Sequence, residues 1–316
     1  MPQEIEYPPV QDIDLDSVKT VDDLVMQMGK GGGFTAKKLH EATSIFKEMI
    51  TRDQCYTFLS FPACIISTGL RGVIKYMVKH KWIDGIITTC GTLDHDLARI
   101  WRNYHHGRFD MDDVELHHRD IHRLGNVLIP MDSYGIILEK KMRELMEDIW
   151  KTGQTEFSTR EIVKEVGLRL EDESSITYWA AKNDIPIYLP GPTDGSFGAQ
   201  LWMWRQSHRD FKLDLFRDEQ ELSDIIFDAE ETGALMIGGG ISKHHVIWWN
   251  QYRDGLDYAV YITTAVEWDG SLSGARVKEG ISWGKVKEEA PHITVEGDAT
   301  VLLPLMAGSI KQQLNR

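Results

Sequence analysis

Four side chains in the last quarter of the chain could act together on an amine. Lys285 comes two residues after Trp283, and Glu279 precedes that indole by four positions. A lysine amine shielded from water becomes a nucleophile, while an indole face and a carboxylate both attract ammonium groups. His244 adds an imidazole that can take up a proton. Taken singly, a lysine is more often merely solvated and a histidine merely packed or capping, so these types indicate amine chemistry only as a group.

A glycine run precedes His244 and predicts how it is positioned. Gly238, Gly239 and Gly240 follow an apolar strand pattern at 234–237, and a helical pattern begins near Ser242. This arrangement brings backbone N–H groups and a helix dipole to a pyrophosphate. The usual G-x-G-x-x-G is absent, so the binding mode differs from that of the common dehydrogenases. His244 would lie in the first helical turn, where the positive dipole end favours a neutral imidazole.

Strand and helix patterns alternate along most of the chain. That rhythm predicts an α/β fold with a doubly wound, mostly parallel sheet of the Rossmann-like kind. The carboxyl ends of neighbouring strands would then face one crevice. Strands are expected at 56–60, 85–89, 127–129, 185–189, 234–237 and 258–262, with helices at 35–51, at 65–80, from Leu93 and at 134–150.

Two other strand exits are rich in small polar residues. Ser67-Thr68-Gly69 at a helix start could bind a phosphate, although ordinary capping explains Ser67 about equally well. Asp194 and Ser196 occupy a glycine-framed turn where a ribose or nicotinamide contact is expected, and a plain turn is an equal alternative. Both exits remain candidates on this basis.

The composition restricts the classes of partner. The chain has 35 Lys and Arg against 49 Asp and Glu, and the net charge of -14 argues against nucleic acid while permitting attraction of polycations. An excess of acidic residues more commonly serves solubility alone than the binding of a partner. The three cysteines form no C-x-x-C pair, and no signal segment or long apolar run occurs. We expect a cytoplasmic protein with no disulfide and no membrane span.

The histidines between 105 and 122 do not predict a metal site. His118 and His122 have the i, i+4 spacing of a zinc pair, but no third ligand is identifiable, so a solvated or subunit-facing helix is expected. Residues 1–20 are acidic and contain Pro8 and Pro9, which predicts an extended arm that can lie on a neighbouring subunit. The glycines around Lys30 predict a flexible turn. No linker divides the remainder, so 21–316 is expected to form a single domain.

Several long motifs occur in a fixed order. They are TTCGTLDHDLAR from Thr88, RLGNVLIP from Arg123, PTDGSFG from Pro192, GGGISKHH from Gly238, YITTAVEWDGSLSGA from Tyr261 and ISWGK from Ile281. In this order they resemble deoxyhypusine synthase, over most of the chain from about Tyr56. The resemblance implies NAD as cofactor, spermidine or a related polyamine as donor, and the translation factor 5A precursor as acceptor. It also implies a homotetramer with active sites between subunits.

The resemblance assigns roles to individual residues. Lys285 would carry the 4-aminobutyl group as an imine, His244 would be the proton-transfer base, and no metal is implied. Cofactor contacts are implied for Ser67, Thr89, Cys90, Gly91, Asp194, Gly239, Thr264, Ala265, Asp298 and Ala299. Substrate contacts are implied for Asp94, His95, His244, Gly270, Glu279 and Trp283.

The chain also departs from the eukaryotic members of that family. Ala199 and Leu272 stand where those enzymes carry aspartates that contact the polyamine, and His95 stands where they carry an acid. We therefore expect an altered donor preference on an intact imine-forming core. A homospermidine-synthase-like enzyme, which transfers the same group to a small amine, and a non-catalytic NAD-binding protein are the alternatives.

Overall fold

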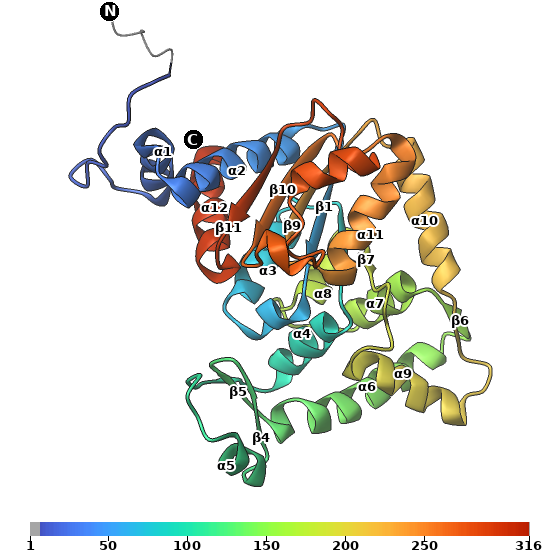
Figure 1. Cartoon of the computed structure of the whole chain (residues 1–316). Coiled ribbons are helices and arrows are strands. Elements are labelled where there is room, and N and C mark those ends of the chain that lie inside the picture. Colours follow the sequence, from blue (N-terminus) through green and yellow to red (C-terminus); the bar gives the residue numbers. More distant parts are fainter. Residues whose placement is uncertain (1–6, 316) are drawn as a thin grey trace, which may run out of the picture.

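A parallel six-stranded sheet forms the centre of the computed structural model, which describes residues 7–315 (Figure 1). The strand order is β11-β10-β9-β1-β2-β7. The chain builds β1, β2 and β7 outward in one direction, then returns to the other side of β1 for β9, β10 and β11. This is the order of the dinucleotide-binding α/β fold, with its reversal between β1 and β9. The strands are β1 (Cys55–Phe61), β2 (Gly85–Thr88), β7 (Ile187–Tyr188), β9 (Glu231–Ile237), β10 (Tyr258–Thr263) and β11 (His292–Glu296).

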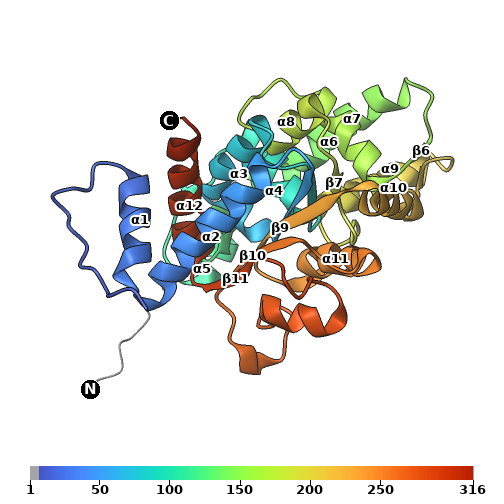
Figure 2. The ribbon, with the colours of Figure 1, turned by 90° about the horizontal axis from the view of Figure 1, so that it is seen from above.

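Helices cover both faces of this sheet, so its inner strands are buried on both sides (Figure 2). Leu235 of β9 packs on the face covered by α2, α3 and α12, and the next residue, Met236, packs on the face of α10 and α11. Because successive side chains of a strand point to opposite faces of the sheet, each strand contributes residues to two hydrophobic cores. The bounds are α2 (Phe34–Thr51), α3 (Leu70–Lys79), α10 (Leu215–Asp228), α11 (Gly240–Asn250) and α12 (Ala299–Leu314). The predicted doubly wound fold is confirmed.

The remaining elements flank the β2–β7 side or connect the strands. The other helices are α1 (Val21–Gly31), α4 (Gly91–Trp101), α5 (Asp113–His118), α6 (Gly135–Trp150), α7 (Thr159–Leu168), α8 (Ile176–Asn183) and α9 (Ser196–Ser207). Short 3-10 helices are η1 (Ala63–Ser67), η2 (Met131–Ser133), η3 (Gln251–Arg253), η4 (Glu267–Asp269) and η5 (Val277–Trp283). Two-residue strands β6 (Glu156–Phe157) and β8 (Lys212–Leu213) form a separate pair. Ser158 caps α7 through a capping box with Glu161.

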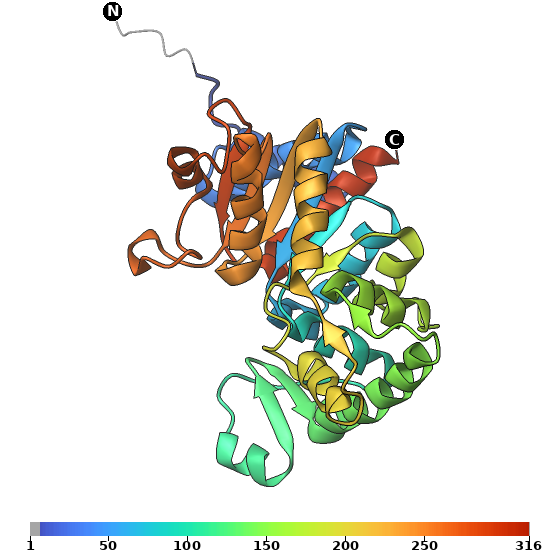
Figure 3. The same cartoon turned by 90° about the vertical axis from the view of Figure 1, so that its right-hand side faces the viewer.

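The prediction of a central strand at 127–129 is wrong. This segment lies in β5 (Val127–Pro130) of an antiparallel ribbon with β3 (His105–His106) and β4 (Ile121–Leu124), which projects away from the central sheet (Figure 3). Leu124 pairs with Val127, and the two-residue loop between them contains Gly125 at φ 61. That loop makes a tight hairpin. His118 ends α5 while His122 lies in β4, so the i, i+4 pair does not share a helix.

Two helix predictions also need correction. The segment 65–80 divides into η1 and α3, because Thr68 has an extended backbone between them. Helix α1 was not predicted: Thr20 and Asp23 form a capping box at its start, and it includes Gly29 and Gly31 of the glycine cluster expected to be a turn. Only Gly32, at φ 66, turns the chain. Residues 7–20 contain neither helix nor strand, while 1–6 of the expected arm lie outside the described residues. None of the helices within 7–315 has the length and apolar character needed to cross a membrane.

Candidate functional site

The carboxyl edge of the sheet gathers the residues expected to bind a cofactor. Because all neighbouring strands are parallel, every strand ends at this edge, and candidates follow each one. They are Ser67 after β1; Thr89, Cys90 and Gly91 after β2; Asp194 after β7; Gly239 after β9; Thr264 and Ala265 after β10; and Asp298 and Ala299 after β11. The fold thus brings to one edge residues that are up to 232 positions apart (299 minus 67).

The strand-order reversal lies between two helix starts. The exit of β9 touches the exit of β1, since a Cβ on Gly238 would lie 3.3 Å from Pro62. Helix α3 begins after Gly69 and α11 begins at Gly240, and an added Cβ at either glycine would meet no atom within 4 Å. Open space at two helix N-termini, beside the switch point, suits a pyrophosphate held by backbone N–H groups. The described residues therefore fit a dinucleotide at the reversal.

The β2 exit is tied to the β1 exit. The Thr89 hydroxyl accepts a hydrogen bond from the Ala63 N–H at 3.0 Å, and a Cβ on Gly91 would lie 3.0 Å from that of Ala63. Cys90 is fully buried, and burial raises the pKa of its thiol to about 12. This turn can offer backbone groups to a ligand, but the Cys90 thiol is not a reactive group.

Asp94 and His95 do not line the cavity of Lys285 within this chain, so their contact with the amine remains a prediction. The fully buried Asp94 carboxylate accepts hydrogen bonds from the Tyr134 hydroxyl (2.7 Å) and from the N–H groups of Ser196 (2.8 Å) and Phe197 (2.6 Å). It therefore caps α9, and burial raises its pKa. His95 contacts the Tyr104 hydroxyl through Nδ1 at 3.0 Å, and burial lowers its pKa to about 4. Both residues act here as internal supports.

Lys285 lies in a cavity of about 370 Å³ between α11 and the segment 272–286. Its side chain is 8% exposed. The backbone is fixed on both sides: the Lys285 N–H donates to the Gly280 carbonyl at 2.9 Å, and its carbonyl accepts from Leu256 at 3.1 Å. Gly284, at φ 66, ends η5 and turns the chain so that Lys285 follows. The lysine is thus held at a fixed position in the cavity wall.

His244, Glu279 and Trp283 line the same cavity, as predicted. The Lys285 Nζ lies 5.2 Å from the centre of the Trp283 ring. The pKa of His244 is lowered, first by burial and then by the charges of Lys285 and His245. A neutral imidazole is therefore the expected state of His244. The main cause of its lowered pKa is burial rather than the helix dipole. Of the other substrate candidates, Gly270 lies in an exposed turn outside the cavity.

Leu272 and Ala199, the two residues that replace aspartates of the eukaryotic enzymes, lie in different parts of the structure. Leu272 lines the cavity and contributes an apolar surface to it. Ala199 is exposed on α9 and does not line this cavity. Only Leu272 can therefore influence an amine bound beside Lys285 within this chain.

Sequence reasoning missed Lys243, which is 3% exposed in the same cavity wall. Its Nζ donates to the carbonyls of Leu272 (2.9 Å) and Ala275 (2.7 Å) and lies 3.6 Å from the centre of the Tyr261 ring. Burial lowers the pKa of Lys243 to about 7. A signal was present, because Lys243 lies three positions before Val246 and so shares the apolar face of α11.

The loop 264–275 joins the cofactor edge to the amine cavity. The Ser273 carbonyl accepts hydrogen bonds from the hydroxyls of Tyr261 (2.6 Å) and Thr263 (2.9 Å). A Cβ on Gly239 would lie 2.1 Å from Ser273 Oγ. Gly239 is therefore required for the loop to pack on the start of α11, whatever it contributes to a cofactor.

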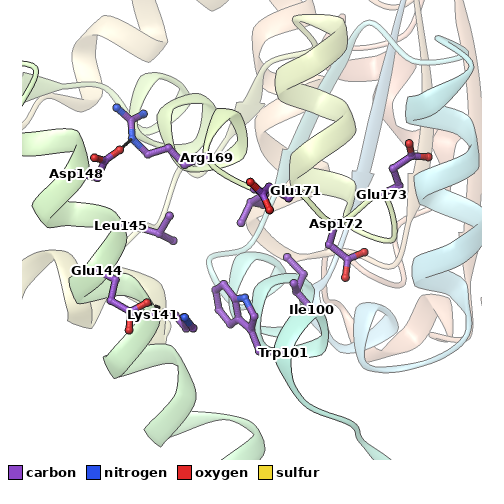
Figure 4. A pocket seen from close by; sticks show the side chains of 11 residues that line it. Ile100, Trp101, Lys141, Glu144, Leu145, Asp148, Arg169, Glu171, Asp172 and Glu173 are labelled. Atoms are coloured by element: carbon purple, nitrogen blue, oxygen red, sulfur yellow. Dashed lines mark hydrogen bonds and ion pairs between the residues drawn. The ribbon is translucent and has the colours of Figure 1, made fainter.

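A larger cleft of about 690 Å³ lies between α4, α6 and the α7–α8 connection (Figure 4). Its acids are largely paired with bases: Glu144 with Lys141 at 2.7 Å, Asp148 with Arg169 at 2.8 Å and Glu173 with Lys79 at 3.3 Å. It holds none of the predicted site residues. Throughout 7–315, no cluster of three or more His, Cys, Asp or Glu side chains is placed to hold a metal ion.

Comparison with known proteins agrees with these motifs. The family model "Deoxyhypusine synthase" matches residues 23–310. A "Probable deoxyhypusine synthase" of Thermoplasma volcanium is 57% identical over 304 residues, covering 96% of this chain and 97% of that protein. The protein of the same description from Thermoplasma acidophilum is 57% identical over 298 residues, covering 94% and 96%.

The fold has a solved counterpart. The crystal structure of "a putative deoxyhypusine synthase" from Entamoeba histolytica superposes with a TM-score of 0.69 at 24% identity, covering 95% of this chain and 96% of that one. At that identity the likeness establishes the fold alone, whereas the full-length sequence matches establish descent. The chain therefore belongs to the deoxyhypusine synthase family and is an enzyme of that family.

Proposed function

We propose that this enzyme transfers the 4-aminobutyl group of spermidine, with NAD as cofactor, to a lysine of the translation factor 5A precursor. This is the first step of hypusine formation. One observation carries the proposal: Lys285 is held in a mostly apolar cavity with an indole beside its amine and His244 in the same wall. That set suits a lysine that forms an imine while a neutral imidazole takes up protons.

The carboxyl edge of the sheet would hold the cofactor. The N-termini of α3 and α11 would receive the pyrophosphate, and the exits of β2, β7, β10 and β11 would bind the remainder. When bound, NAD accepts a hydride from the donor amine and later returns one to the product imine. The residues of the chain contribute orientation and exclusion of water.

Lys285 would perform the covalent step. Its Nζ attacks the oxidised carbon of the donor, a new C–N bond forms, the original C–N bond breaks, and 1,3-diaminopropane leaves with the proton that His244 relays. The lysine of the acceptor protein then displaces Lys285. Glu279 and Trp283 would hold the ammonium groups of the donor during both steps.

The decisive experiment is a transfer assay with butyl-labelled spermidine and NAD, offering either the translation factor 5A precursor or putrescine as acceptor. We expect label on the precursor. Label on putrescine instead would establish the homospermidine-synthase-like alternative, and no transfer to either acceptor would overturn the proposal.

Lys285→Arg tests the covalent residue. A guanidinium stays protonated and cannot form this imine, so we expect loss of transfer with the fold retained. Borohydride added to the native enzyme with NAD and spermidine should leave a butylamine mass on the Lys285 peptide. Normal transfer by the arginine variant, or trapping on another residue, would overturn the assignment.

The assembly and domain organisation are part of the same proposal. Trp283 (61% exposed), Trp248 (41%) and Trp268 (86%) present large apolar surfaces around the site, which supports a homotetramer that covers them. Residues 21–316 are proposed as one domain, because helix α1 packs on α12 at the other end of the chain, with the Asp22 N–H donating to Gln312 at 2.8 Å. Sedimentation equilibrium would test the tetramer.

A further inference from the structure

Two indoles from different elements flank the Lys285 amine. Trp283 belongs to η5, and Trp248 lies on α11 one turn after His244. The Lys285 Nζ is 5.2 Å from the centre of the Trp283 ring and 6.0 Å from that of Trp248, and both rings line the cavity. Both distances are within the range in which a cation is attracted to a ring face. An amine of the protein itself thus already lies within cation–π distance of both indoles.

Ion pairing alone cannot account for binding of a polycationic donor here. Glu279 is the one carboxylate among the residues that line this cavity within 7–315, whereas Arg276 adds positive charge to the same wall. Arg276 is partly neutralised from outside, by Glu267 at 3.1 Å and Glu296 at 3.6 Å. A triamine such as spermidine carries more ammonium groups than this wall offers carboxylates. Within this chain, the indole faces are the other groups of the cavity wall that attract ammonium ions.

The reaction fixes which ammonium would lie between them. For attack, the Lys285 Nζ must come within roughly 3 to 3.5 Å of the reacting carbon, and that carbon is bonded to the secondary nitrogen of the donor. That nitrogen therefore lies beside Nζ, near both rings. We propose that Trp248 is a specificity-determining residue whose indole, together with that of Trp283, recognises the secondary ammonium of the donor. This inference rests on the proposed function.

The neighbours of Trp248 hold it in this position. The His244 ring stacks on it with centres 5.8 Å apart and planes at 24°, and Tyr252 meets it edge-on at 5.9 Å. The adjacent Trp249 is used differently, since its Nε1 donates to Glu219 at 2.8 Å and it does not line the cavity. The orientation of Trp248 is thus set by the same imidazole that the reaction requires.

Substitutions at Trp248 separate ring-face recognition from packing. Trp248→Leu keeps an apolar side chain without a π face, while Trp248→Phe keeps a face. We expect the dissociation constant for spermidine, measured by calorimetry without NAD, to rise about tenfold in the leucine variant and about threefold or less in the phenylalanine variant. Trp202→Leu is the matched control, because Trp202 is exposed on α9 and does not line the cavity.

A donor analogue gives the sharper comparison. In 1,8-diaminooctane a CH₂ replaces the secondary ammonium of spermidine at the same chain length. Trp248→Leu should weaken spermidine binding and leave diaminooctane binding nearly unchanged. If the binding of both amines weakened equally, Trp248 would be a packing residue without a role in recognising the secondary ammonium. Unchanged spermidine binding would overturn the inference outright. Failure of the proposed function looks different, because the native enzyme would then bind spermidine without transferring label.

Discussion

At the scale of single residues, Lys243 is the group whose role changes most between sequence and structure. Its amine reaches two carbonyls of the loop 264–275. A neutral amine keeps two N–H donors, which is enough for both. Loss of a proton by Lys243, whose pKa in the folded protein is about 7, therefore breaks neither hydrogen bond. The neutral lysine can hold the loop without burying a charge.

This arrangement predicts a pH-dependent stability. The folded pKa of Lys243 is about 7 against an ordinary 10.5, so between these values the unfolded chain binds more protons. Stability from this group therefore rises with pH across that window and is lost as pH falls towards 7. Lys243→Met should lower the free energy of unfolding by about 1 to 3 kcal/mol near pH 9, because two carbonyls lose their donor, and by less near pH 7.

Thermal unfolding of both proteins at the two pH values checks the prediction. Lys278→Met, at an exposed position of η5, is the control and should change little at either pH. A difference between native protein and Lys243→Met that does not grow with pH would mean that the amine stays charged in the cavity wall.

At the scale of elements, the start of α3 offers a clean test of the cofactor position. Gly69 has φ -63 and Gly72 lies one turn further along the helix, and at both an added Cβ meets open space. Leucine at Gly72, inside the helix, favours the helix by roughly 0.5 to 1 kcal/mol. Leucine at the N-cap position Gly69 brings no such gain. If a pyrophosphate approaches the α3 N-terminus, Gly69→Leu should weaken NAD binding at least about tenfold while Gly72→Leu leaves it unchanged.

Titration of NAD against both variants, with melting curves, gives the answer. Equal affinities in the two variants would place the pyrophosphate away from α3. Gly239→Val is a poorer probe, although the glycine run first suggests it. A side chain there collides with Ser273 and displaces the loop 264–275, so any loss of NAD would have two causes.

At the scale of the whole molecule, the net charge of -14 should act on the approach of the donor. A strongly anionic protein attracts a polycation over distances set by the Debye length, which shrinks from about 14 Å at 0.05 M salt to about 4 Å at 0.5 M. We expect kcat/KM for spermidine to fall several-fold across this range while kcat changes little.

Initial rates at several NaCl concentrations, with spermidine varied, measure this effect. The KM for NAD, an anion, should not rise in parallel. A kcat/KM for spermidine that is indifferent to salt would show that the acidic surface serves solubility and leaves donor capture to the cavity itself.

Sequence patterns predicted five of the six strands of the central sheet, all except β11, and the motifs identified the family. Apolar runs such as 234–237 and 258–262 specify buried strands, and Gly238 to Gly240 specify a chain turn that other residues resist, because these signals are local. The ribbon at 127–130 was misassigned because a short apolar run does not state its pairing partner. Strand order supplies that partner, and it depends on the whole chain.

Only the tertiary structure decided which side chains meet. Asp94 turns inward to Ser196, 102 positions away, and Lys243 reaches Leu272, 29 positions away. Trp248 and Lys285 approach each other from different elements, and neither carries a local sign of the other. Such contacts arise when helices and loops pack on the two faces of the sheet, and packing responds to shape and volume, for which sequence periodicity has no signal. The motifs could therefore predict the chemistry, while the second indole and the buried amine became visible only in the folded chain.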